Sequence, residues 1–272
     1  LGMTAGLCYP GDDPAGRAAA ALFAENDARV LRGEGMSTLE LCNRMGQLPL
    51  AFHPGEHFRY STCADVLGAV VEVAGKKPFA RFLEEEIFQP LGMKDTAFWV
   101  PAEKRGRFAQ AYTQPGALRP YRQTHLEVGD YDREPVFASG GAGLVSTLDD
   151  YAAFATMLLE GGRYPGGQLF QPETVRFLTS PQLGPQPLAD VWNSLDGFSY
   201  GKLMRVMRDP GRYPGLSRMD EYGWDGWLGT YFANFPHEQM TMLMMTQRTD
   251  HGTGPLTRKL RNLLLSSPEA RL

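Results

Sequence analysis

The sequence predicts a mixed α and β protein with an antiparallel sheet flanked by helices. Apolar residues recur at helical spacing through residues 1–185, strand-like segments gather in residues 186–272, and one helical segment follows them. Because the strands come in a run instead of alternating with helices, an antiparallel sheet is favoured over a parallel one. We expect 1–185 to form a mostly helical region, and 186–272 to supply strands and a final helix to the same domain.

Five helices are predicted from apolar spacing and from glycine, proline or capping residues at their ends. They are 64–74, with Leu67, Val70 and Val71 on one face and Gly75 at its end; a helix between Pro78 and Pro90, with Phe79, Phe82, Leu83 and Ile87; a helix after Thr147, with Tyr151, Phe154 and Leu158; a short helix from Pro172, with Val175 and Leu178; and a helix from Pro255, with Leu256, Leu260, Leu263 and Leu264 on one side.

Three strands are predicted in the last third of the chain. Residues 198–207 form one, and 228–235 and 240–247 form two more, joined by a turn at residues 236–238. Residues 240–247 are nearly continuous in methionine, leucine and threonine, which predicts a central, buried strand. Three strands alone would make a thin, partly uncovered sheet.

Composition excludes several classes of function. The 272 residues carry a net charge of -4 without a basic block, so no nucleic-acid partner is expected. No apolar run approaches the roughly 18 residues that span a membrane. The odd number of cysteines (Cys8, Cys42 and Cys63) disfavours a disulfide framework or zinc cluster, and we expect buried thiols. Walker and dinucleotide-binding motifs are absent, and we expect no cofactor.

Three short motifs have both a functional and an ordinary interpretation. Residues 53–57, His-Pro-Gly-Glu-His, match a zinc pattern, but the Pro-Gly pair favours a turn over the helix that zinc binding needs. Ser199 and Lys202 form the chain's single Ser-x-x-Lys; a strand there would place them on opposite faces. Residues 140–143, Gly-Gly-Ala-Gly, lack a lysine and indicate a tight bend.

Five segments, taken in order, resemble class C β-lactamases and their esterase and D-amino-peptidase relatives. They are 3–7 (Met-Thr-Ala-Gly-Leu), similar to His-Thr-Ser-Gly-Leu; 54–61 (Pro-Gly-Glu-His-Phe-Arg-Tyr-Ser), similar to Pro-Gly-x-x-Phe-x-Tyr-Ser; 87–96, similar to a Pro-Leu-Gly-Met-x-Asp-Thr segment; 140–150, similar to Gly-Gly-x-Gly-Leu-x-Ser-Thr-x-x-Asp; and 223–230, at the place of the third active-site motif.

The resemblance implies a β-lactamase/transpeptidase-like fold, in which a helical region is inserted into an antiparallel sheet and the active site lies between them. In this family a Ser-x-x-Lys helix carries the nucleophile. That helix and the first strands are expected upstream of Leu1 and missing from this sequence. The chain alone is therefore predicted to be inactive, to have low stability and to expose apolar surface.

Site residues follow from the resemblance. Tyr60 matches the tyrosine of the Tyr-x-Asn motif, which would share proton transfer with the nucleophile. Thr62 stands where the family often has asparagine, which casts doubt on recognition of a substrate amide. Trp224, Asp225 and Gly226 correspond to Lys-Thr-Gly; without a cation, and with the negative charge of Asp225, a carboxylate-bearing β-lactam should bind poorly. The backbone N–H of Trp227 would complete an oxyanion hole.

The function implied by the resemblance is that of a serine hydrolase acting on a small ester, amide or peptide through an acyl-enzyme. Neutral substrates, or substrates with an amine, fit the absence of a cation best. A non-catalytic member that binds peptides or assembles with partners is the alternative, because one fold can serve both. A metalloprotein that uses His53, Glu56 and His57 is a third hypothesis.

Overall fold

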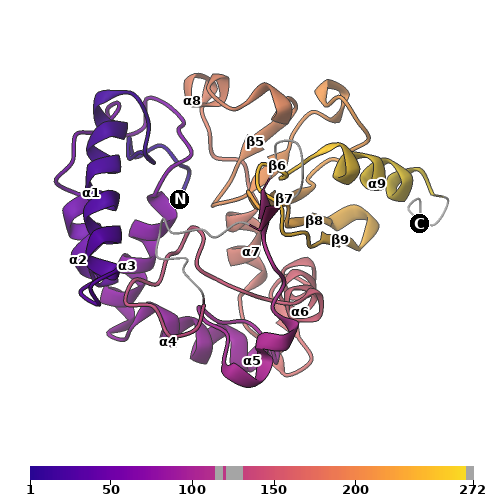
Figure 1. Ribbon diagram of the computed structural model, residues 1–272. Helices are drawn as coiled ribbons and strands as arrows, with labels where there is room; N and C mark the ends of the chain where they lie inside the picture. The colour runs from indigo at the N-terminus through magenta and orange to yellow at the C-terminus, as the bar shows by residue number, and fades with distance from the viewer. Residues whose placement is uncertain (114–118, 121–130, 268–272) are drawn as a thin grey trace. The chain divides into compact units, whose positions relative to one another are not determined.

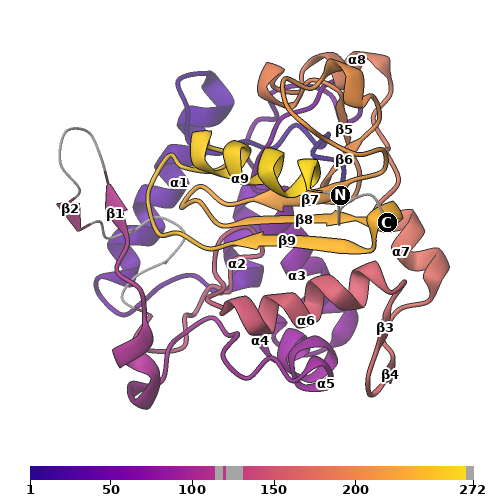
Figure 2. The same cartoon turned by 90° about the vertical axis from the view of Figure 1, so that its right-hand side faces the viewer.

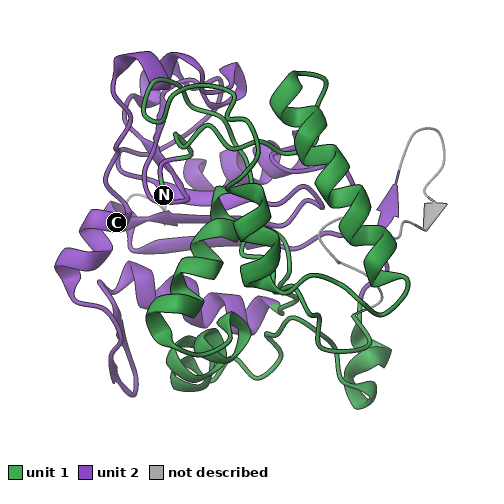
Figure 3. Cartoon of the chain, turned by 90° about the vertical axis from the view of Figure 1, so that its left-hand side faces the viewer, with its two compact units in different colours: residues 1, 3–108, 122–147 green, residues 2, 109–121, 148–272 purple. Residues whose placement is uncertain are grey.

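The structure is a computed structural model that describes residues 1–113, 119–120 and 131–267. The chain divides into two compact units, coloured separately in Figure 3. Unit 1 comprises residues 1, 3–108 and 122–147, and unit 2 comprises residues 2, 109–121 and 148–272. Within the described residues, no helix is long and apolar enough to cross a membrane. The predicted division of one domain at residue 185 stays a prediction.

Unit 1 is built from helices around an apolar core (Figure 1). Asp13 and Ser37 begin its first two helices by accepting the backbone N–H groups of Gly16 and Glu40, helix starts that we did not predict. The helices are α1 (Pro14–Val30), α2 (Thr38–Met45), α3 (Cys63–Gly75), α4 (Phe79–Leu83) and α5 (Gln89–Leu91), with a π-helical turn at Glu84–Phe88 and a 3₁₀ helix at Ala102–Arg107. The core contains Leu22, Phe23, Met36, Leu41, Cys42, Met45, Ala69 and Phe137.

Two details of the predicted helices in unit 1 are wrong. α3 forms as predicted, but Val70, expected on its buried face, is 55% exposed, because Gly68 and Ala69 turn toward the core instead. Pro90 does not stop the second helix. It lies in α5, which continues directly from the π-helical turn at Glu84–Phe88, and the helix ends at Gly92 with φ 68°.

Unit 2 is built on a five-stranded antiparallel sheet in the order β5-β6-β7-β8-β9. Its strands are β5 (Phe198–Tyr200), β6 (Arg205–Met207), β7 (Tyr222–Asp225), β8 (Tyr231–Phe235) and β9 (Met240–Met244). Its helices are α6 (Leu148–Leu159), α7 (Pro172–Leu178), α8 (Pro185–Ala189) and α9 (Pro255–Ser266), with small hairpins β1–β2 (Tyr112–Thr113, Arg119–Pro120) and β3–β4 (Arg163–Tyr164, Gly167–Gln168).

The sheet corrects two predictions. Residues 198–207 are not one strand but a hairpin: the N–H of Gly201 donates to the carbonyl of Met204 at 2.8 Å, and Leu203 has φ 60°. With β7 added, this makes five strands instead of three. β9 is the last strand of the sheet order instead of a central one, and most of its residues are only partly buried.

Helices α6 and α9 cover opposite faces of this sheet (Figure 2). On the α6 face, the Asn234 amide donates to the carbonyl of Ala155 at 2.8 Å. On the other face, Leu265 of α9 packs with Ala233 and Phe235. Of the four leucines predicted on one side of α9, Leu264 packs against this cluster, whereas Leu256, Leu260 and Leu263 are exposed at 48%, 39% and 68%. Thr257, Arg261 and Leu265 are buried instead, because Arg261 has ion-pair and hydrogen-bond partners beneath the helix.

Candidate active site

Tyr60 lies in an extended segment of unit 1 that runs into α3. The backbone N–H of Arg59 donates to the carbonyl of Met3 at 2.9 Å, and the N–H of Ala51 donates to the carbonyl of Gly6 at the same distance. The sequence pieces 3–7 and 54–61 are thereby held side by side. Tyr60 is half-buried.

Asp65 ties a third segment to this place. It lies in the first turn of α3 and is fully buried. Its Oδ1 accepts the hydroxyl of Ser139 at 2.5 Å and the backbone N–H of Gly141 at 3.2 Å. A Cβ at Gly140 would lie 2.2 Å from the carbonyl oxygen of Ala64, so this close approach requires glycine. The predicted bend at 140–143 is confirmed as a turn, and it docks on the start of α3.

Tyr9 completes the surroundings of Tyr60. The two rings lie 6.0 Å apart, and a Cβ at Gly141 would lie 2.9 Å from the Tyr9 hydroxyl and 3.2 Å from Oδ2 of Asp65. Burial, with Asp65 and Tyr60 nearby, raises the pKa of Tyr9, and burial raises the pKa of Asp65. Neither residue is predicted as a site residue from the sequence, although a charged residue within an apolar helix, such as Asp65, is a usable signal.

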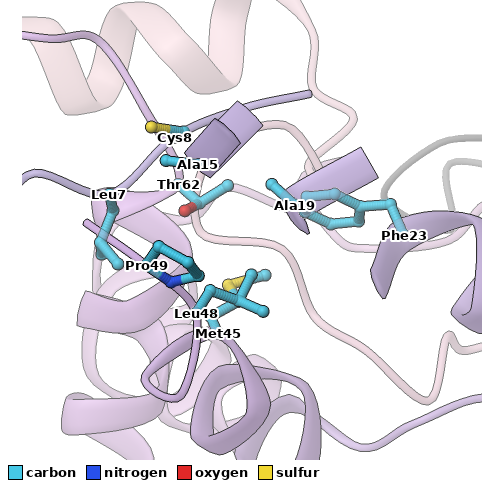
Figure 4. Close-up of a pocket in the computed structure, with 9 residues that line it drawn as sticks. All are labelled: Leu7, Cys8, Ala15, Ala19, Phe23, Met45, Leu48, Pro49 and Thr62. Carbon is cyan, nitrogen blue, oxygen red and sulfur yellow. The ribbon is translucent and has the colours of Figure 1, made fainter. Parts of the chain in front are cut away.

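Thr62 is 1% exposed and lines a small apolar pocket in unit 1 (Figure 4). The pocket has room for about one water molecule. The other lining residues are Leu7, Cys8, Ala15, Ala19, Phe23, Met45, Leu48 and Pro49. A substrate-binding role for Thr62 stays a prediction. Cys8, Cys42 and Cys63 are all buried and free of disulfides, as expected.

The other predicted site residues lie at one end of a hairpin in unit 2. Trp224 and Asp225 end β7, and Gly226 and Trp227 begin the turn to β8. The N–H of Gly226 donates to the carbonyl of Thr230 at 2.7 Å, which closes the turn. Trp227 is 45% exposed, and its indole N–H donates to Asp250 at 2.6 Å.

Asp225 does not present the free negative charge expected from the sequence. Its Oδ1 accepts from Nη1 of Arg205 at 2.9 Å, and its Oδ2 accepts from the backbone N–H of Thr253 at 2.8 Å. Arg205 is 2% exposed. The charge of Asp225 is therefore paired, so the expectation of a free negative charge is wrong, while the substrate preference stays a prediction. The two residues are not neighbours in the sequence, and they meet only because β6 and β7 pair.

The zinc-like motif at residues 53–57 and the Ser-x-x-Lys of Ser199 and Lys202 form ordinary turn and hairpin structure. The zinc-like motif forms a turn, in which the N–H of Glu56 donates to the carbonyl of His53 and Gly55 has φ 95°. Within the described residues, no group of side chains could hold a metal ion. Ser199 lies in β5, as predicted, and Nζ of Lys202 lies 4.1 Å from the centroid of the Phe177 ring.

Comparison with known proteins identifies relatives of this chain. The chain is 32% identical over 238 residues to esterase EstB of Burkholderia gladioli, covering 82% of the chain and 58% of that protein. It is 30% identical to a putative D-alanyl-D-alanine carboxypeptidase of Escherichia coli K12, covering 78% of the chain and 49% of that protein. The chain thus spans about half the length of the curated relatives it matches.

Solved structures show the same fold. EstCE1, a hydrolase with promiscuous acyltransferase activity, aligns over 96% of this chain and 69% of its own, with a TM-score of 0.78 and 23% identity. A model of the Beta-lactamase family matches residues 1–265, nearly the whole sequence. This chain therefore belongs to the beta-lactamase family of serine hydrolases and penicillin-binding-protein-like proteins.

Proposed function

We propose that the chain forms part of a serine hydrolase that cleaves uncharged esters or amides through an acyl-enzyme. The observation that carries this proposal is the convergence of three family segments around Tyr60. Backbone hydrogen bonds join residues 3–7 to 54–61, and Asp65 binds the 140–143 turn. A tyrosine fixed in this way can share proton transfer with a serine nucleophile.

The turn between β7 and β8 supplies the second part of the proposal. The backbone N–H of Trp227, directly after Gly226, would donate to the oxyanion together with the N–H of the nucleophile itself. This role depends on backbone placement, which the Gly226–Thr230 hydrogen bond and the Trp227–Asp250 hydrogen bond support. The Trp224 and Trp227 side chains would contribute apolar walls.

We place the nucleophile outside residues 1–272. A serine nucleophile needs a base within hydrogen-bonding reach. The single Ser-x-x-Lys of this sequence has Ser199 buried in a strand and Lys202 against Phe177, which does not provide that arrangement. The 272-residue chain by itself is therefore expected not to turn over esters.

The test compares this chain with the product of its complete gene on an uncharged p-nitrophenyl ester. We expect turnover from the complete product only, and a fall in kcat of roughly 10²–10⁴-fold for its Tyr60→Phe variant. Tyr112→Phe, at an exposed tyrosine of β1, is the matched control and should keep full activity. Labelling by a fluorophosphonate locates the nucleophilic serine. A complete product that neither turns over esters nor takes the label would favour the non-catalytic, peptide-binding alternative.

A further inference from the structure

Arg205, at the start of strand β6, is a buried cation whose partner is the carboxylate of Asp225, at the end of the neighbouring strand β7. We infer that Arg205 is an anion-binding group and that Asp225 occupies it as a built-in anion, which makes this end of the sheet electrically neutral and selects uncharged acyl groups. The selectivity rests on the proposed function, because it requires that β7 borders the acyl site. The ion pair between Arg205 and Asp225 does not depend on the proposed function.

The surroundings of Arg205 hold its guanidinium in one orientation. The guanidinium carbon lies 4.9 Å from the centroid of the Tyr231 ring and 5.6 Å from that of Phe198. Nη2 lies 3.4 Å from the carbonyl oxygen of Phe232, to which it donates. Aromatic rings favour a cation beside them, and a buried guanidinium without an anion would be costly. Nη1 is thus aimed at Asp225, at 2.9 Å.

Asp225 reaches from this buried cation toward the surface. Its side chain is 20% exposed, against 2% for Arg205. The carboxylate also accepts the N–H of Thr253, which anchors the loop that leads into α9. A Cβ on Gly252 would lie 2.4 Å from Oδ2 of Asp225, so the loop can approach this closely only with glycine. The carboxylate therefore fills a site with donors on two sides.

A site of this kind is expected to accept a free carboxylate once the built-in one is removed. Asp225→Gly deletes the anion and leaves Nη1 of Arg205 and the N–H of Thr253 pointing into the vacated space. Guanidinium groups bind carboxylates through short, charge-assisted hydrogen bonds. Acetate should enter this space, whereas acetamide, which has nearly the same shape but no charge, should not.

The experiment measures thermal unfolding of the complete gene product and its variants. We expect Asp225→Gly to lower Tm by roughly 5–10 °C. Acetate at about 0.1 M should restore at least half of that loss, whereas acetamide or sodium chloride at equal concentration should not. The double variant Arg205→Met/Asp225→Gly should not respond to acetate. An acetate response no larger in Asp225→Gly than in the double variant would overturn the inference.

A second pair of variants covers the case in which Asp225→Gly does not fold. Asp225→Asn keeps the volume of the side chain and removes its charge. Its effect on the unfolding equilibrium constant should be at least about tenfold larger with Arg205 present than in an Arg205→Met background. Equal effects in the two backgrounds would show that the charges are not coupled.

Selectivity is measured separately, as the ratio of kcat/KM for p-nitrophenyl butyrate to that for mono-p-nitrophenyl succinate. Asp225→Gly should shift this ratio about tenfold toward the anionic ester. Rescue by acetate without such a shift would support Asp225 as a built-in anion of Arg205 but would overturn its role in selectivity. Rescue by acetate in a product without any esterase activity would support the ion pair and overturn the proposed function. Failure of this inference and failure of the proposed function can therefore be distinguished.

Discussion

Asp65 in unit 1 and Asp225 in unit 2 hold loops beside predicted site residues, but they do so with different partners. Asp65 is fully buried and accepts from an uncharged hydroxyl and a backbone N–H. Asp225 is partly exposed and accepts from the guanidinium of Arg205. The hydrogen bonds to Asp65 thus come from neutral donors and reach Oδ1, whereas Asp225 accepts from a cation as well as from a backbone N–H.

The difference extends beyond the two aspartates. In unit 2, Arg261 pairs with the fully buried Glu221 through Nη2 at 2.9 Å, and its Nη1 donates to the Tyr231 hydroxyl. Tyr231 lies between Arg261 and Arg205, and the Ser217 hydroxyl donates to Glu221 at 2.6 Å. The buried Arg205 and Arg261 of unit 2 are therefore each paired with a carboxylate, whereas Asp65 has neutral donors, and its burial raises its pKa. We expect loss of one partner to cost more in unit 2.

The largest effect is expected from Arg261→Met. It would leave the carboxylate of Glu221 buried without its cation, at a cost of about 3–5 kcal/mol in the free energy of unfolding. Arg258→Met, on an exposed position of the same helix, should stay within about 0.5 kcal/mol. Denaturant unfolding monitored by circular dichroism measures both. Adding Glu221→Gln to Arg261→Met should recover part of the loss, and similar costs for the two arginine variants would contradict a stabilising ion pair between Arg261 and Glu221.

An intermediate, pH-dependent effect is expected from Asp65→Asn. The pKa of Asp65 is raised above its ordinary value of 3.8, so the folded state holds a proton that the unfolded state releases. Its contribution to stability is present below that ordinary pKa and is lost as pH rises through the raised pKa. The asparagine cannot titrate. It should cost roughly 1–3 kcal/mol near pH 4 and less at neutral pH.

Unfolding free energies measured from about pH 4 to about pH 7 test this difference. Asp132→Asn, at an exposed aspartate, serves as the control and should differ little from the parent at any pH. A cost for Asp65→Asn that stays constant over the range would mean that Asp65 is ionised throughout. Asp65 would then carry a negative charge in the folded state, as Asp225 does in its ion pair with Arg205.

The smallest effect on stability is expected at the exposed leucines of α9. Leu256→Lys and Leu263→Lys together should change the free energy of unfolding by only about 0.5 kcal/mol, because both side chains are exposed. They should nevertheless reduce self-association of the 272-residue chain, since exposed apolar stripes promote contact between molecules. Sedimentation velocity measures this. Leu31→Lys, at a solitary exposed leucine of unit 1, should leave association unchanged.

Local sequence patterns determined several elements of this protein. α3, α7 and α9 were predicted near their observed bounds, because prolines, glycines and apolar spacing act within a few residues of the helix they define. The turns at 236–238 and 140–142 form for the same local reason. Family membership also followed from the sequence, because five short segments in order specify it closely, and the family match over residues 1–265 confirms it.

Only the tertiary structure decided which of these surfaces are buried and which charges are paired. Three of the four leucines on the predicted side of α9 are exposed because Arg261 has Glu221 and Tyr231 as partners beneath the helix, and no local pattern reveals those partners. β9 lies at the edge of the sheet because the five strands pair in chain order, which the apolar composition of β9 does not reveal. Arg205 neutralises Asp225 because the pairing of β6 with β7 brings these two residues together. The formal charge of a residue follows from its type. Whether another group neutralises that charge depends on which groups folding brings within hydrogen-bonding distance.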